Sequence, residues 1–108
     1  MKAYDLAIIG AGPGGYVSAI YASRCGLKTC LVEKDLLGDT CLNKGCIPTK
    51  AVLASAKVLS TVKSAKDYGI DVAEIKLNFG QVQKRKDDVV KRQRSGIEFL
   101  IKARQIDY

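Results

Sequence analysis

Four cysteines are the residues of this sequence whose type and spacing best suit chemistry. They follow the pattern Cys-x4-Cys-x10-Cys-x4-Cys and lie at Cys25, Cys30, Cys41 and Cys46. Such spacing is compatible with a metal site or a small dithiol module that uses all four. Cys25 falls near the end of a predicted helix and Cys30 inside a predicted strand, where free cysteine is commonly buried as a small apolar residue. This interpretation leaves Cys41 and Cys46 for redox chemistry, with the four-cysteine module as the alternative.

Cys41 and Cys46 are five residues apart, which a regular helix does not bring together. Residues at that separation are about 140° apart around a helix axis, and their Cα atoms lie near the ~7 Å limit for a disulfide. A bridge therefore needs an irregular first turn, which Gly45 and Pro48 permit. Cytoplasmic disulfides are usually catalytic rather than structural. A helix N-terminus and two nearby lysines would favour a thiolate: Lys44 and Lys50.

A second candidate site is the glycine-rich segment GAGPGG at residues 10–15. It fits G-x-G-x-x-G between a predicted strand and a predicted helix, the pattern of a dinucleotide-binding loop. Gly10 permits the tight turn, Gly12 lets the backbone approach a pyrophosphate, and Gly15 lets the helix pack against the strand. Amides at the helix N-terminus favour the dianion. Glu33, at the end of the next predicted strand, can accept hydrogen bonds from an adenosine ribose.

These candidates require an α/β fold with parallel strands. The pattern predicts a strand over Tyr4–Ile9, a helix over Gly14–Cys25 with Gly26 as its cap, and a strand over Thr29–Glu33, which together form a βαβ unit. The remaining elements are expected as a loop at 34–40, a helix from Cys41 to about Ala65, a break at 67–69, a loop at 70–77, a helix over roughly Asn78–Ala103, and the start of a further strand at 105–108.

Composition limits the alternatives. The 108 residues are 47% hydrophobic, enough for one compact domain. No apolar run approaches the ~20 residues that would span a bilayer, and the amino-terminal apolar stretch is too short for a signal peptide. A soluble cytoplasmic protein without a membrane segment is therefore predicted. No histidine is present, which removes the usual proton carrier at neutral pH.

The net charge of +7 comes largely from residues 84–104, where eight basic residues stand against three acidic ones, a net +5. Val82, Val89, Val90, Ile97, Leu100 and Ile101 recur there at near-helical spacing. We interpret the segment as a solvated amphipathic helix. A nucleic-acid-binding scaffold is the alternative that charge alone suggests, but no aromatic residues interleave with the basic ones. We expect no nucleic-acid partner.

Three segments together resemble the flavoprotein pyridine nucleotide-disulfide oxidoreductases: the amino-terminal glycine loop, the Val-Glu-Lys strand end at 32–34 and the segment TCLNKGCIPTK at 40–50. Within that class the Cys-Leu-Asn-x-Gly-Cys-Ile-Pro form is most similar to the dihydrolipoamide dehydrogenases, with another disulfide reductase of the family as the alternative. The likeness extends over essentially the whole chain. It implies a partial Rossmann-like FAD-binding domain with a Gly-rich βαβ unit and two long helices.

The resemblance also implies roles. Cys41 would be the interchange thiol that exchanges with dihydrolipoyl groups, and Cys46 the charge-transfer thiol beside the flavin, with Lys50 near its ring. Electrons would pass through the disulfide and FAD to NAD. The remaining residues expected at FAD are Gly10, Gly12, Pro13, Gly14, Gly15, Glu33, Lys34, Gly38, Asp39 and Thr40. The partners implied are a lipoyl-bearing protein and a second copy in a homodimer or other self-association.

Three features depart from the family pattern. Asp39 stands where the family usually has a second glycine; it adds negative charge near a dianion and restricts φ. Lys44 usually corresponds to an apolar residue. The length matches only an amino-terminal portion, so we expect residues 1–108 to be part of an FAD-binding domain. The NAD-binding and dimerisation domains are expected to be absent, and this portion alone to be an incomplete, inactive enzyme.

Overall fold

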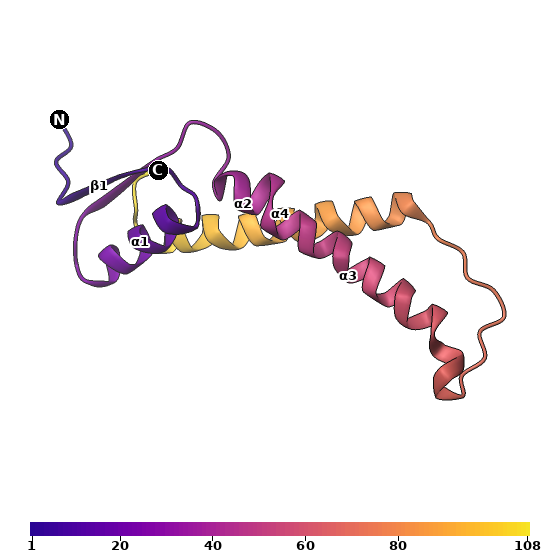
Figure 1. Cartoon of the computed structure of the whole chain (residues 1–108). Helices are drawn as coiled ribbons and strands as arrows, with labels where there is room; N and C mark the ends of the chain where they lie inside the picture. The colour runs from indigo at the N-terminus through magenta and orange to yellow at the C-terminus, as the bar shows by residue number, and fades with distance from the viewer.

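The computed structural model describes residues 1–108 as an α/β unit from which a long helical arm extends (Figure 1). The chain measures 66 × 24 × 18 Å. The elements, in order, are β1 Leu6–Ile9, α1 Pro13–Arg24, β2 Thr29–Val32, α2 Asp39–Lys44, α3 Cys46–Lys63, the short 3₁₀ helix η1 Ala65–Tyr68, and α4 Phe79–Ala103. None of the helices is both long and apolar enough to cross a membrane.

The predicted βαβ unit is confirmed. β1 and β2 pair in parallel, with Leu6 opposite Thr29 and Ile9 opposite Val32. Ala19, where α1 packs on this sheet, is fully buried. The helix ends through Gly26, which has φ +86° in the left-handed region that glycine adopts without a Cβ penalty. The amide of Leu27 donates to the Ala22 carbonyl at 3.1 Å, so the last turn of α1 is closed.

A third chain segment lies on the other side of β2. Asp107 forms a parallel bridge with Cys30, and the Leu31 amide donates to the Asp107 carbonyl at 2.8 Å. The segment predicted to begin a strand at 105–108 therefore contributes a single bridge. The segment is held at Asp107, whose carboxylate accepts hydrogen bonds from the Tyr4 hydroxyl at 2.5 Å and from the Lys2 ammonium at 3.1 Å.

The helix predicted from Cys41 to Ala65 is wrong in one respect: it is two helices. α2 begins at Asp39, inside the predicted loop, and ends at Lys44. Gly45 then has φ −126° and ψ −108°, far from helical values, and α3 starts at Cys46. Pro48 lies in the first turn of α3, where a missing amide proton leaves no helical hydrogen bond unmade. Gly45, rather than Pro48, supplies the irregularity.

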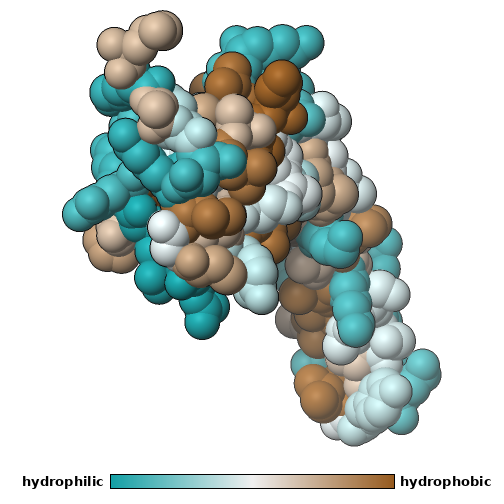
Figure 2. Space-filling view, turned by 90° about the vertical axis from the view of Figure 1, so that its left-hand side faces the viewer, coloured by the Kyte–Doolittle hydropathy of each residue, from teal (hydrophilic) through white to brown (hydrophobic).

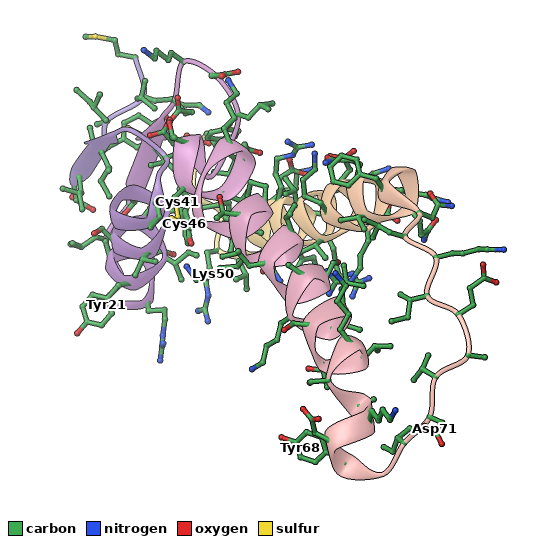
Figure 3. All side chains as sticks on the ribbon, turned by 45° about the vertical axis from the view of Figure 1, so that its right-hand side comes forward. Tyr21, Cys41, Cys46, Lys50, Tyr68 and Asp71 are labelled. Atoms are coloured by element: carbon green, nitrogen blue, oxygen red, sulfur yellow. The ribbon has the colours of Figure 1, made fainter.

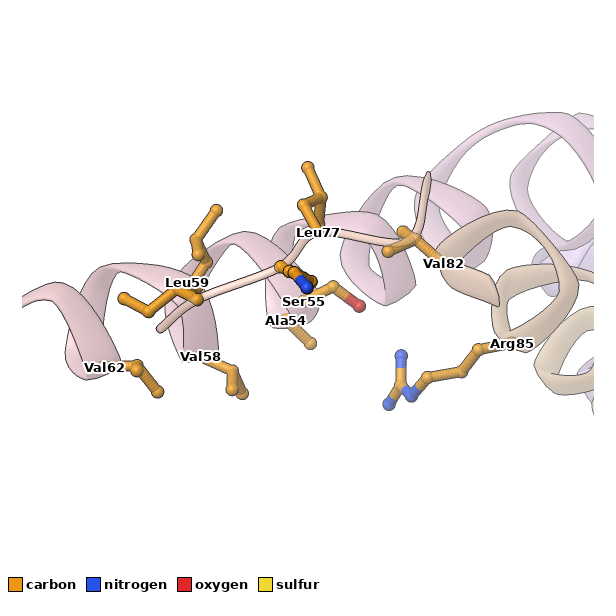
Figure 4. Close-up of a pocket in the computed structure, with 10 residues that line it drawn as sticks. Ala54, Ser55, Val58, Leu59, Val62, Leu77, Val82 and Arg85 are labelled. Carbon is orange, nitrogen blue, oxygen red and sulfur yellow. The ribbon is translucent and has the colours of Figure 1, made fainter. Parts of the chain in front are cut away.

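The carboxyl-terminal half of α3 and the amino-terminal half of α4 form the arm, joined by η1 and the loop at 69–78. Asn78 caps α4 by accepting a hydrogen bond from the Gln81 amide at 3.0 Å. Apolar side chains are exposed along this arm in the space-filling view (Figure 2). They partly enclose a hollow of about 410 Å³, with Leu59, Leu77 and Val82 among its walls (Figure 4).

The core lies in the α/β unit, where α1, β2, α2 and the end of α4 meet. Only 13 of the 108 residues are buried, and eight of these form one hydrophobic cluster: Ala11, Ala19, Leu31, Leu37, Leu42, Ile97, Ile101 and Ile106. The cluster joins the glycine loop, the loop before α2 and the amphipathic face of α4. Ile97 and Ile101 of the basic helix therefore pack in the same core as Ala11 of the glycine loop, and this contact fixes the end of α4 relative to the loop.

Candidate dinucleotide and dithiol site

The glycine loop has the geometry that a close helix–strand approach demands. Gly10 has φ +99°, in the left-handed region, and turns the chain directly after β1. A Cβ added to Gly15 would lie 1.7 Å from the carbonyl oxygen of Gly10, so α1 packs on that turn with no room for a side chain. A Cβ on Gly14 would meet nothing within 4 Å. Gly10 and Gly15 thus shape the loop, while Gly14 faces open space.

Glu33 clamps this loop from the end of β2. One carboxylate oxygen accepts from the Ala11 amide at 2.7 Å, and the other accepts from the amides of Lys34 and Asp35 at 2.8 and 3.1 Å. These hydrogen bonds, that from Ala11 above all, hold the pKa of Glu33 below its ordinary value. The ionised carboxylate therefore ties the glycine loop to the segment that follows β2.

The segment before α2 returns to the same loop. The Gly38 amide donates to the Ala11 carbonyl at 2.8 Å, and Gly38 has φ +96°. A Cβ added to Gly12 would lie 3.5 Å from both Cβ and Oδ2 of Asp39, an ordinary contact. Apart from Asp39, the backbone at Gly12 is open to a ligand. The loop therefore fits the pyrophosphate of a dinucleotide, with one carboxylate at its edge.

Cys41 and Cys46 come together across the break at Gly45, as Figure 3 shows. Both are free thiols in this structure; Cys41 is half-buried and Cys46 is exposed. A hydrogen bond with Cys46 raises the pKa of Cys41, burial raises it further, and the positive charge of Lys50 partly offsets both. The expectation that a nearby lysine favours a thiolate agrees with the effect of Lys50, but at Cys41 the hydrogen bond with Cys46 is the larger influence and the net pKa is raised.

The two lysines predicted beside the pair differ in position. Lys50 lies one turn along α3 from Cys46 and close to the pair (Figure 3). Lys44 instead pairs with Asp35 at 3.5 Å. It shares a polar hollow of about 250 Å³ with Lys34, Asp39 and Thr40. The hollow borders α2 beside the segment that follows Glu33, and both Lys34 and Thr40 line it.

Two residues that hold the site together were not predicted from the sequence. The Asn43 side-chain amide donates to the carbonyls of Leu37 and Asp39 at 3.1 and 2.9 Å. Arg94 on α4 donates to the Asn43 carbonyl oxygen at 2.8 Å. Asn43 stands within the Cys-Leu-Asn motif, but its partners lie six residues back and 51 residues ahead. Sequence spacing gives no indication of that link.

The alternative that all four cysteines form one module has no support in the geometry. Cys25 is the exposed cap of α1, and Cys30 lies within β2. The structure contains no group of three or more histidine, cysteine, aspartate or glutamate side chains placed to hold a metal ion. Two basic side chains of α4 donate to residues outside that helix: Arg94 to the Asn43 side chain, and Arg85 to the Ala51 carbonyl at 3.0 Å.

Comparison with known proteins accounts for this combination of loop and dithiol. The family model described as pyridine nucleotide-disulphide oxidoreductase matches residues 4–108. A dihydrolipoyl dehydrogenase of Bacillus subtilis is 51% identical over 104 residues, covering 96% of this chain and 22% of that protein. The mitochondrial dihydrolipoyl dehydrogenase of Schizosaccharomyces pombe is 52% identical over 107 residues, 97% of this chain and 21% of the relative.

A third relative, the dihydrolipoyl dehydrogenase of Acholeplasma laidlawii, is 48% identical over 107 residues, which is 98% of this chain and 32% of that protein. The chain thus spans between about a fifth and a third of the length of the relatives that it matches. The family match covers the glycine loop, the cysteine pair and both long helices in one continuous alignment. The chain belongs to the pyridine nucleotide-disulphide oxidoreductase family.

Proposed function

We propose that this chain is the FAD-binding and redox-dithiol portion of a dihydrolipoyl dehydrogenase, which oxidises dihydrolipoyl groups and passes the electrons through Cys41 and Cys46 and FAD to NAD. The dinucleotide is FAD, as membership of the family implies. The observation that carries the proposal is the meeting of the two thiols across the Gly45 break, with Cys41 on α2, the helix that starts beside Gly12 of the glycine loop.

The chain's own residues would divide the binding work. The glycine loop would receive the pyrophosphate at Gly12, with the free amide of Gly14 in the first turn of α1 directed toward it. Pro13 has no amide proton to donate; it would fix the backbone at the first position of the helix. Glu33 would accept from the ribose while it keeps the loop closed through Ala11. FAD would supply the two-electron chemistry that thiols alone do not perform with NAD.

Thiol exchange is the step that these residues perform. With Cys41 and Cys46 joined as a disulfide, a dihydrolipoyl thiolate attacks the Cys41 sulfur, and Cys46 leaves as a thiolate. The second lipoyl thiol then attacks the mixed disulfide, the lipoyl ring closes, and Cys41 is released. The substrate loses two electrons and two protons overall, and the cysteine pair takes up both electrons.

Oxidised lipoamide tests the exchange in the reverse direction without flavin. Reduced protein incubated with excess lipoamide should lose two of its four titratable thiols, and peptide mapping should place the new disulfide between Cys41 and Cys46. A Cys25→Ser, Cys30→Ser variant should behave in the same way, whereas Cys41→Ser should form no such bridge. Four unreacted thiols, or a bridge that involves Cys25 or Cys30, would contradict the assignment.

The lipoyl-bearing partner, a homodimeric state and a cytoplasmic location belong to the same proposal. The relatives are dihydrolipoyl dehydrogenases, and the apolar side chains exposed on the arm suit further burial. Sedimentation of the purified chain over a range of concentrations tests self-association; a single monomer species at all concentrations would remove that part of the proposal.

A further inference from the structure

Asp39 has a backbone conformation that few side chains tolerate. Its φ is +49°, and only one other residue besides glycine, Gln105, has a positive φ. Aspartate and asparagine visit this left-handed region more readily than other residues with a Cβ. Gly38 immediately before it is also left-handed, with φ +96°. Two successive left-handed residues turn the chain so that Asp39 is directed back at the glycine loop.

The side chain of Asp39 lies against the point where a dinucleotide must come closest. The positions 3.5 Å from a Cβ built on Gly12 are the Cβ and Oδ2 atoms of Asp39, and nothing else is nearer. Gly12 is the residue that caps α1 at its N-terminus. A pyrophosphate bound there would therefore lie beside a carboxylate as well as beside the helix amides.

No cation in contact neutralises this carboxylate. The four salt bridges of the chain do not include Asp39, and its side chain accepts only a long hydrogen bond of 3.4 Å from the Thr40 hydroxyl. Two lysines border the same polar hollow: Lys44 is paired with Asp35, and Lys34 forms no salt bridge with Asp39. The negative charge at Gly12 is thus left to solvent, which screens it but does not cancel it.

We propose that Asp39 limits the affinity of the glycine loop for the dinucleotide: its carboxylate repels the pyrophosphate and has to turn away before the ligand can approach Gly12. The proposal rests on FAD binding as the function of this loop. The side chain is exposed, so the relevant dielectric is close to that of water. Repulsion between one carboxylate and two phosphate charges at about 5 Å then corresponds to roughly a tenfold loss of affinity at low salt.

Two substitutions separate the charge from the bulk. Asp39→Asn removes the charge and keeps both the shape and the tolerance for a positive φ. Asp39→Gly removes the charge, the Cβ beside Gly12 and the conformational restriction together. Asp35→Asn is the matched control, because Asp35 borders the same hollow but its carboxylate faces Lys44 rather than Gly12.

The test is the dissociation constant of FAD for the full chain, measured by equilibrium dialysis at low salt and again near 1 M salt. Asp39→Asn should bind FAD about tenfold more tightly than the unsubstituted chain at low salt, and the gap should nearly close at high salt, where charges are screened within about 3 Å. Asp39→Gly should bind at least as tightly as Asp39→Asn. Asp35→Asn should differ little from the unsubstituted chain.

Equal affinities for the unsubstituted chain and Asp39→Asn would overturn the proposal and leave FAD binding intact. Equal gains for Asp39→Asn and Asp35→Asn would also overturn it, since net charge rather than position would then be the cause. If no variant and no unsubstituted chain binds FAD, the proposed function itself fails, and the role of Asp39 fails with it. A melting curve of each variant verifies that the asparagine substitutions leave the fold unchanged.

Discussion

The contact between α1 and the β1 turn makes Gly15 the most demanding position of the chain. A Cβ at Gly15 would lie 1.7 Å from the Gly10 carbonyl oxygen and 2.8 Å from the Gly10 carbonyl carbon. Both atoms belong to the backbone of a left-handed turn, so no flexible side chain can move aside. In Gly15→Ala the helix has to retreat by roughly 1.5 Å to restore ordinary contact.

The cost follows from comparing two opposed effects. Overpacking that forces a backbone shift costs about 3 kcal/mol at the upper end of its usual range, while alanine gains up to about 1 kcal/mol over glycine inside a helix. We therefore expect Gly15→Ala to lose about 2 kcal/mol of folding free energy. For a domain of this size, that corresponds to a fall in Tm of roughly 10 °C.

Gly14→Ala is the matched control because it makes the same substitution one residue earlier, where a Cβ meets nothing within 4 Å. It should leave the Tm unchanged or raise it by a few degrees. Urea unfolding followed by circular dichroism, together with thermal melts, measures both variants against the unsubstituted chain. Equal melting temperatures for the two alanine variants would refute the steric argument and show that α1 shifts on the sheet at little cost.

Three further predictions concern ionisable groups. Glu33→Ala should cost about 1–3 kcal/mol in urea unfolding, because a buried amide of the glycine loop loses its acceptor; no loss would mean that water replaces the carboxylate. The hydrogen bond between Tyr4 and Asp107 raises the pKa of Tyr4 to about 12 and lowers that of Asp107. The pair should therefore stabilise the fold fully between the ordinary carboxyl and phenol pKa values. The part due to Tyr4 should be lost as the pH rises from about 10 to 12, and the part due to Asp107 should be lost as the pH falls below the ordinary carboxyl pKa. Tyr4→Phe should flatten both limbs of the Tm profile, and an unchanged profile would exclude this pair. Cys46→Ala removes the hydrogen bond that raises the pKa of Cys41, so Cys41 should react faster with iodoacetamide at pH near 8; a slower reaction would contradict the geometry.

The local elements of the site could be predicted because short-range physics determines them. Gly10 and Gly26 adopt left-handed φ values that glycine accepts without strain, and both stand where the sequence pattern places a turn. The parallel pairing of the two strands follows from a helical crossover between two apolar runs. An irregular turn between Cys41 and Cys46 was expected for a bridged pair, since a regular helix would keep the two thiols apart, but the start of a separate helix at Cys46 was not predicted.

Other features depend on contacts that spacing does not encode. Lys44 and Lys50 were expected to favour a thiolate in the cysteine pair. Lys50 does lower the pKa of Cys41, but the hydrogen bond with Cys46 raises it more. Pro48 was expected to interrupt a helix, but it lies in the first turn of α3, where proline is compatible with helical hydrogen bonding. Both outcomes depend on where Gly45 divides the segment.

By itself, the sequence determined the glycine loop, the spacing of the cysteine pair and the apolar stripe of the basic helix, because these are patterns within one element or one turn. Only the tertiary structure decided what those elements hold in place. Arg94 reaches Asn43 across 51 residues, and Asp39 comes to lie beside Gly12. The first contact arises because α4 packs beside α2, and it anchors the helix that carries Cys41. The second arises because the segment before α2 returns to the glycine loop, where the Gly38 amide donates to the Ala11 carbonyl and places a carboxylate beside Gly12.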